Sequence, residues 1–148
     1  MKWLLDTNVI SESVHHRPNR AVVNWLRRHP PPDAVVSIVT IAELRVGVDR
    51  TRNPQRRAVL ASWMSNEMEP EFREHSLPLT IEILTEWLGL GRRNAIAGKT
   101  RAPADLLIAA TGRVHDLIVV TRNVGDFVGT GILVYDPWQD KTQQMDLA

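Results

Sequence analysis

Short runs of apolar residues, separated by longer segments with apolar residues at helical spacing, constrain the fold of this chain most strongly. The runs occupy residues 3–5, 34–37, 117–120 and 132–134, and a possible shorter strand lies at 77–79. A run that is apolar throughout indicates a strand buried on both faces, and strands that alternate with helices are typical of a parallel sheet. We therefore predict a three-layer α/β/α fold with a mainly parallel central sheet.

The segments between these runs predict the helices. Helices are expected over 21–28, from Thr40, from Pro54 to 66, from the cap Thr80, and over 106–114. The apolar face of the helix after Thr80 is expected to consist of Ile81, Leu84, Trp87 and Leu88. Residues 67–74 are acidic and are expected to be irregular. The length of 148 residues fits one domain spanning 1–148, in which 136–148 form a polar surface tail.

Several classes of protein are excluded by what the chain lacks. It contains no cysteine, which rules out disulfides, thiolate zinc sites and cysteine nucleophiles. Its histidines do not form an HExxH or HxxxH pattern, and there is no Walker-type loop and no GxSxG motif. No segment approaches the roughly 18 apolar residues of a membrane span. We expect a cytoplasmic protein with no membrane association.

Four acidic residues occupy positions that a structural role could explain one at a time. Asp6 follows the first strand, where turns favour aspartate, and Asp126 lies in a turn-like segment after the 117–120 strand. Glu43 completes a capping box that begins at Thr40. Asp105 falls in the first turn of a helix, where its charge would complement the helix dipole. None of these acids indicates a function by itself.

Taken together, the same acids indicate a metal site. In a parallel sheet, residues that follow the strands or open the next helices meet at the carboxyl edge. Clustered carboxylates repel one another, and the usual reason for keeping them together is a hard divalent cation. The sequence therefore predicts a site for Mg²⁺ or Mn²⁺ formed by Asp6, Glu43, Asp105 and Asp126.

Four segments carry a family resemblance and follow one another in the family's order. They are residues 5–12, 37–44 with Gly47, 103–112 and 121–127. With these segments the chain resembles the PIN-domain ribonucleases, and most closely the VapC-type toxins of toxin–antitoxin pairs, in the FitB-like branch. The resemblance implies that Asp6, Glu43 and Asp105 bind the metal.

The resemblance also implies supporting roles for Thr7, Asn8 and Thr121 through hydrogen bonds. It departs from the family at the fourth acid, because many relatives carry aspartate where this chain has Asn123. Asp126 is the nearest acid, and Asn123 is the alternative as a residue that holds a metal-bound water.

The function that the resemblance implies is that of a ribonuclease toxin. It would cleave RNA phosphodiester bonds with metal-activated water, leaving 5′-phosphate and 3′-hydroxyl ends. It would form a homodimer and be neutralised by a cognate antitoxin, for which Trp25 and Trp63 either line a groove or belong to the core. The alternatives are an inactive PIN-like module that binds RNA or protein, and another metal-dependent phosphoesterase. A haloacid-dehalogenase phosphatase would carry aspartate in place of Asn8.

Arginine is the main basic residue, and its planar guanidinium suits phosphate. Two basic clusters are candidates for holding the RNA backbone, and a solvated surface is the alternative for both. The first consists of Arg50, Arg52, Arg56 and Arg57, and the second of Arg92, Arg93, Lys99 and Arg101.

Overall fold

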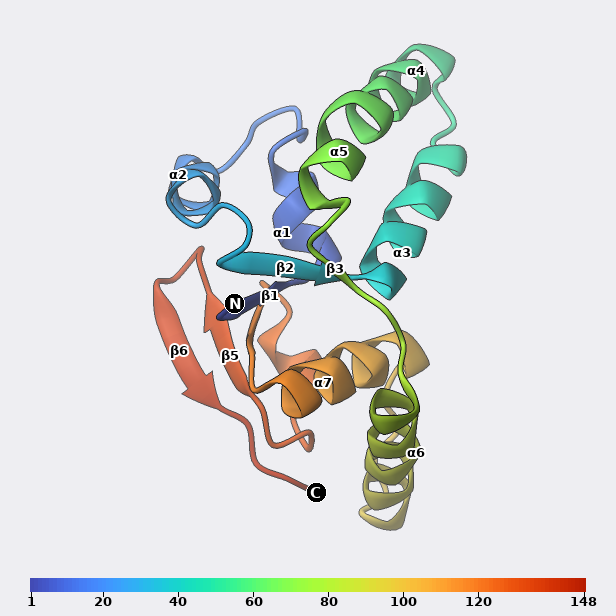
Figure 1. Cartoon of the computed structure of the whole chain (residues 1–148), viewed down its shortest axis with the longest axis vertical. Coiled ribbons are helices and arrows are strands. Elements are labelled where there is room, and N and C mark those ends of the chain that lie inside the picture. The colour runs from blue at the N-terminus through green and yellow to red at the C-terminus, as the bar shows by residue number, and fades with distance from the viewer.

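The computed structural model describes residues 1–148 and has a six-stranded sheet at its centre (Figure 1). The strands are β1 (Trp3–Leu5), β2 (Ala34–Ser37), β3 (Ser76–Leu77), β4 (Ile118–Val120), β5 (Leu133–Asp136) and β6 (Lys141–Gln144). Their order across the sheet is β3-β2-β1-β4-β5-β6. Every neighbouring pair is parallel except β5 and β6, which are antiparallel. The predicted sheet, mainly parallel, is confirmed.

The helices cover both faces of this sheet. They are α1 (Thr7–Glu12), α2 (Arg20–Arg28), α3 (Ile38–Asp49), α4 (Pro54–Trp63), α5 (Glu69–Phe72), α6 (Ile81–Ile96) and α7 (Pro103–His115), with a π-helical turn η1 (Met64–Met68) and a 3-10 turn η2 (Val124–Phe127). Figure 1 shows α1 to α5 on one side of the sheet and α6 and α7 on the other. The three layers are those that the alternation predicts.

The central strands are buried on both faces, as runs of apolar residues require. In β1, Trp3 and Leu5 contribute to the apolar cluster on the side of α1 and α2, whereas Leu4 contributes to the cluster on the side of α7. Val119 and Val120 of β4 divide between the two clusters in the same way. Because successive side chains of a strand point to opposite faces, such strands need apolar residues at every position.

Local capping sets the start of several helices. Thr80 accepts a hydrogen bond from the amide of Ile83, which confirms it as the cap of α6. The expected start of α3 at Thr40 is wrong. Ser37 caps that helix by accepting from the amide of Val39, and Thr40 lies inside the first turns with its hydroxyl buried and unpaired.

Residues 67–74 are more regular than their acidic sequence suggests. The chain continues from α4 through η1 into α5, and Met64, Met68 and Phe72 are buried in the cluster beneath them. The three apolar residues are spaced four apart, which is a helical period that the acidic neighbours obscure. The helix α1, directly after Asp6, was also not expected; it buries Val9 and Ile10.

The segment 136–148 is not the surface tail that its polarity suggests. Most of its side chains are exposed, but β6 pairs with β5 over four residue pairs, from Leu133–Gln144 to Asp136–Lys141. Met145 then enters the apolar cluster on the α7 side. An edge strand is held by backbone hydrogen bonds, so its side chains need not be apolar, and the sequence pattern gives little sign of it.

The face of α6 that packs against α7 is also different from the expected one. The buried residues of α6 are Ile83, Leu90 and Asn94, whereas Ile81 and Leu88 are 80% and 66% exposed. Trp87 is partly buried, and its indole N–H donates to the carbonyl of Pro103 at the start of α7. The apolar stripe read from the sequence therefore lies mostly on the outer face of α6. No helix has the length and apolar character needed to cross a membrane.

Gly129 provides a test of how η2 is held against α6. Its φ is +91°, and the side chain of Asn94 donates to its carbonyl at 3.2 Å. A Cβ at this position would lie 2.3 Å from Asn94 Oδ1. We expect Gly129→Ala to lower the free energy of unfolding by about 2 kcal/mol or more, because a strained φ and a steric clash add together.

Chemical denaturation of both proteins measures this effect. Gly47→Ala is the matched control, since Gly47 lies within α3 and an added Cβ there meets nothing within 4 Å. The control should stabilise by about 0.5–1 kcal/mol through its higher helix propensity. Equal stability of Gly129→Ala and the parent protein would show that this contact does not fix the segment.

Candidate active site

Asp6 lies at the carboxyl edge of the sheet, where hydrogen bonds hold its carboxylate in place. It follows β1, is 8% exposed, and its Oδ1 accepts from the amide of Thr7 at 2.8 Å. Its Oδ2 accepts from the hydroxyl of Thr121 at 2.8 Å and from the amide group of Asn8 at 3.2 Å. Thr121 follows the neighbouring strand β4, so this carboxylate joins the ends of two parallel strands.

The partners of Asp6 are themselves satisfied by one another. Asn8 Nδ2 also donates to Thr121 Oγ1 at 3.0 Å, and Asn8 Oδ1 accepts from the amide of Arg122 at 3.0 Å. Thr121 Oγ1 accepts a further bond from the amide of Asn123 at 3.1 Å. The hydroxyl thus donates once and accepts twice, which uses its full capacity. The structure brings Asn8 and Thr121 together around Asp6, while Asn123 contributes only its backbone.

Glu43 reaches the same place from α3. Its Oε1 accepts from the hydroxyl of Thr7 at 3.3 Å. Although the residue as a whole is exposed, partial burial and the negative charge of Asp6 raise the pKa of its carboxyl. The alternative role in a capping box does not hold, because Ser37 rather than Thr40 caps α3.

Asp105 lies in the first turn of α7 and is half-buried. Burial, followed by the negative charges of Asp126, Asp6 and Glu43, raises the pKa of its carboxyl to about 6, against an opposing effect of Arg101. A helix N-terminus by itself lowers the pKa of an acid. Burial and the neighbouring carboxylates act in the opposite direction and disfavour the charged form of Asp105.

Asp126 lies in η2 and is exposed. Its charge contributes to raising the pKa of both Asp105 and Asp6, which places it in the same electrostatic neighbourhood. Burial is the larger cause of the raised pKa of Asp6, and its hydrogen bonds oppose the increase. Of the two candidates for the fourth position, Asp126 is the one that adds negative charge to the site.

These carboxylates form a loose group rather than a ready-made cage. No three acidic or histidine side chains are arranged closely enough to hold a metal ion. Their chemistry nevertheless fits Mg²⁺ or Mn²⁺, because the group offers only oxygen ligands and carries repelling charges that a cation would relieve. Binding would require side-chain rotations, for which the exposed Glu43 and Asp126 have room.

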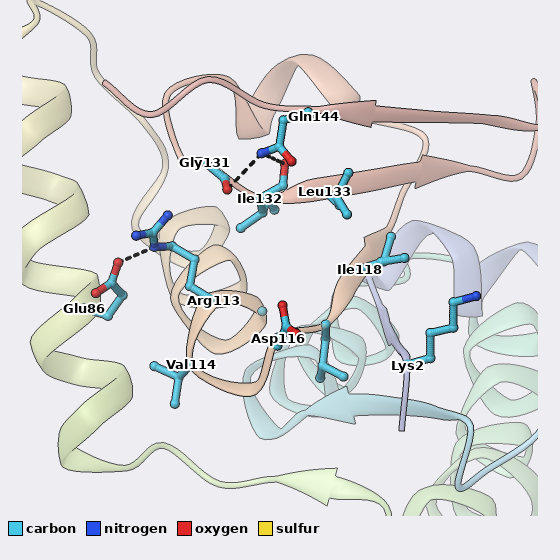
Figure 2. Close-up of a pocket in the computed structure, with 12 residues that line it drawn as sticks. Lys2, Glu86, Arg113, Val114, Asp116, Ile118, Gly131, Ile132, Leu133 and Gln144 are labelled. Atoms are coloured by element: carbon cyan, nitrogen blue, oxygen red, sulfur yellow. Dashed lines mark hydrogen bonds and ion pairs between the residues drawn. The ribbon is translucent and has the colours of Figure 1, made fainter.

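The cavity drawn in Figure 2 lies away from these acids. It has a volume of about 540 Å³ and lies at the amino ends of the strands, near Lys2 before β1 and Ile118 at the start of β4. Figure 2 shows Arg113 and Glu86 paired at one side of it. It is lined by two carboxylates, Glu86 and Asp116, and Glu86 is paired with Arg113, so the edge where Asp6, Glu43, Asp105 and Asp126 lie remains the candidate site.

The arginines of the two predicted RNA-binding clusters differ in exposure and in hydrogen bonding. Arg50, Arg52, Arg92 and Arg93 are exposed. Arg56 and Arg57 instead donate to backbone carbonyls of Val14 and Thr51, which gives both a structural role.

Two arginines lie at the acidic edge itself. Arg101 donates to the carbonyl of Gly125 at 3.2 Å and opposes the raised pKa of Asp105. Arg122 follows Thr121 and was not among the predicted RNA-binding residues. Its position two residues after the strand that ends at Val120 is the sequence feature that could have identified it as a residue of this edge.

The chain matches known proteins over most of its length. Residues 3–128 match the PIN domain family. The chain is 37% identical to the toxin FitB of Neisseria gonorrhoeae, over 93% of this chain and 99% of FitB. It is 32% identical to the VapC ribonuclease Y4jK of Sinorhizobium fredii, over 92% of this chain and 97% of that protein.

The structural comparison extends over the same length. The crystal structure of FitAcB from Neisseria gonorrhoeae matches with a TM-score of 0.85 and 37% identity, covering 92% of this chain and 98% of that one. The family match over residues 3–128 spans the segments that carry Asp6, Glu43, Asp105 and Asp126. The chain therefore belongs to the PIN-domain family, in its FitB-like branch of VapC-type proteins.

Proposed function

We propose that this protein is a Mg²⁺- or Mn²⁺-dependent endoribonuclease that acts as the toxin of a toxin–antitoxin pair in the cytoplasm. The observation that carries the proposal is the convergence of four carboxylates, from four different segments, at one edge of the sheet. The names of two relatives support the reaction, since they are a VapC ribonuclease and a tRNA(fMet)-specific endonuclease.

The four acids have different parts in this proposal. Asp6 is held rigidly by Thr121 and Asn8, which suits a ligand that fixes the position of the cation. Glu43, oriented by Thr7, and Asp105 complete the metal-binding set, and Asp126 is the fourth ligand. When bound, the cation would acidify a water and neutralise charge on the phosphate.

Arg101 is the one cation that opposes the raised pKa of Asp105. Its positive charge favours the ionised form of that carboxyl, which is the form that binds a metal. It also ties the backbone at Gly125, next to Asp126, to the segment that leads into α7. This hydrogen bond holds the segments that carry Asp105 and Asp126 near one another.

Asp105→Asn tests the catalytic assignment. We expect RNA cleavage in the presence of Mg²⁺ to fall by more than about a hundredfold, because loss of a residue that merely supports a ligand already costs about 10–100-fold. Cleavage of labelled RNA, with mapping of the product ends, measures the effect. Glu74→Gln, an exposed acid just before β3, is the matched control and should retain activity.

Three outcomes would contradict the proposal. Undiminished cleavage by Asp105→Asn would remove Asp105 from the site. Absence of both RNA cleavage and Mn²⁺ binding in the wild-type protein would favour an inactive module that binds RNA or protein. Hydrolysis of small phosphoesters without RNA cleavage would favour another metal-dependent phosphoesterase.

The same substitution should stabilise the metal-free protein at neutral pH. The pKa of Asp105 is raised from 3.8 to about 6 in the folded protein, so its ionised form destabilises the fold. This destabilisation is fully present above pH 6 and is lost as the pH falls toward the unfolded value. Asp105→Asn should therefore be more stable than the parent at pH 7.5 in EDTA, and the difference should shrink by pH 4.

Thermal unfolding of both proteins across this pH range gives the measurement. Addition of Mn²⁺ at pH 7.5 should reverse the order of stability, because only the parent binds the ion tightly. A variant that is less stable than the parent at pH 7.5 without metal would indicate that Asp105 serves mainly to start α7.

A cognate antitoxin is the partner that we propose for this toxin. The support is the FitAcB complex, together with a mainly apolar cavity of about 340 Å³ between α1, α2 and η1. Trp63 lines this cavity, beside Val14 and Leu26. Trp25 instead packs against Trp3 and His29 in the core, so only one of the two tryptophans is available to a partner.

The homodimer that we propose would use the outer face of α6. Ile81 and Ile96 are 80% and 78% exposed and lie seven and eight residues from Leu88, which is 66% exposed. Two copies of α6 packed antiparallel about Leu88 would bring Ile81 of each copy near Ile96 of the other. Both copies would then use the same face, as a two-fold interface requires.

Leu88→Glu should convert this dimer into monomers, because two like charges would face each other at the centre of an apolar interface. Sedimentation velocity of the purified proteins measures the change. Val59→Glu on α4 replaces a residue of comparable exposure, 57%, and should leave the dimer intact. A wild-type protein that is monomeric at all concentrations, or a Leu88→Glu dimer, would rule out this interface.

A further inference from the structure

Arg122, which is exposed, lies over the partly buried ring of Trp138 beside the acidic edge. Arg122 follows β4 through Thr121, and Trp138 lies just beyond the end of the next parallel strand, β5. The guanidinium carbon lies 5.3 Å from the centre of the Trp138 ring, which is a cation–π distance. Both residues therefore lie beyond the carboxyl ends of parallel strands, as Asp6 does beyond β1.

The backbones of both residues are fixed. The amide of Arg122 donates to Asn8 Oδ1 at 3.0 Å, and Asn8 in turn donates to Asp6. The amide of Trp138 donates at 2.8 Å to the buried carboxylate of Asp136. The Trp138 side chain is partly buried and packs against the apolar cluster that includes Trp25. The arginine therefore lies over a rigid aromatic surface.

The guanidinium of Arg122 has no partner of opposite charge. The chain has two ion pairs, Arg45–Glu69 and Arg113–Glu86, and Arg122 belongs to neither. The cation that opposes the raised pKa of Asp105 is Arg101. Arg122 is exposed, so its donors face solvent next to a group of carboxylates without pairing with one.

This arrangement suits a phosphate of an RNA strand. A guanidinium presents two parallel N–H groups to phosphate oxygens, and stacking on an aromatic ring restricts its orientation in advance. Single-stranded RNA is commonly held by arginine planes and aromatic side chains together. A cation beside a cluster of negative charges also relieves the repulsion that the RNA backbone would otherwise meet there.

We propose that Arg122, supported by Trp138, is a substrate-binding residue that holds a backbone phosphate of single-stranded RNA on the β5 side of the acidic site. The proposal rests on the proposed ribonuclease function and adds the direction in which the RNA strand crosses the site. The substrate passes the Asp6 carboxylate toward the end of β5, and neither basic cluster at 50–57 or 92–101 is needed for this contact.

Arg122→Gln tests the contact in full-length protein that also carries Asp105→Asn, so that the RNA is not cleaved. The probe is a short fluorescein-labelled single-stranded RNA of mixed sequence, and anisotropy is measured over a range of salt concentrations. We expect binding about tenfold weaker at low salt, as for the loss of one charged hydrogen bond. The plot of log affinity against log salt should become shallower by about 0.7, the effect of one phosphate on a single strand.

Two further variants separate this role from a structural one. Arg122→Lys keeps the charge, so it should restore the salt dependence but only part of the affinity, because an ammonium group lacks the planar fork. Arg73→Gln removes an exposed arginine before β3, at the opposite edge of the sheet, and should bind RNA like the parent. Neither Mn²⁺ affinity nor unfolding temperature should fall in Arg122→Gln.

If Arg122→Gln binds RNA with the same affinity and salt dependence as the parent, the proposal is wrong. A protein partner would then be the ligand that Arg122 and Trp138 contact. A loss of RNA binding matched by a loss of Mn²⁺ affinity or stability would overturn the proposal in favour of a structural role. Failure of the wild-type protein to cleave RNA would remove the proposed reaction, whereas weaker RNA binding by Arg122→Gln would still establish the contact.

Discussion

The buried hydrogen bond from Thr121 to Asp6 is the interaction on which the site depends. It joins the ends of β1 and β4, two neighbouring parallel strands whose residues are 115 positions apart in the sequence. Asn8 contacts both partners and also holds the backbone at Arg122. Because each polar group in this network has a partner, a carboxylate that is 8% exposed can be kept at the sheet edge.

The other acids are placed by elements that this bond does not fix directly. Glu43 and Asp105 come from α3 and α7, which cover opposite faces of the sheet, and both have a raised pKa. Negative charges held near one another lower the stability of the fold, and the packed helices on either side must offset that cost. A site that is costly in this way is consistent with a role in binding a cation rather than with a structural role.

The sequence predicted the strands that are buried on both faces. It could not predict features that depend on contacts with segments distant along the chain. The strands β1 and β2 were found because residues buried on both faces must be apolar throughout. β6 was missed because an edge strand needs only its backbone, and Lys141–Gln144 carries no apolar pattern. On α6, the spacing revealed an apolar stripe but not whether that stripe faces α7 or the outside, since the helix has apolar residues on both sides.

Glu43 shows why local patterns alone do not decide the function of an acid. The sequence from Thr40 to Glu43 fits a capping box, yet Ser37 caps the helix three residues earlier. The deciding information is the start of α3, which follows directly from the end of β2 at the sheet edge. Once the helix begins there, Glu43 lies a turn and a half inside it, where no free backbone amide needs its carboxylate. Its contact with Thr7, across 36 residues, then accounts for its orientation toward Asp6.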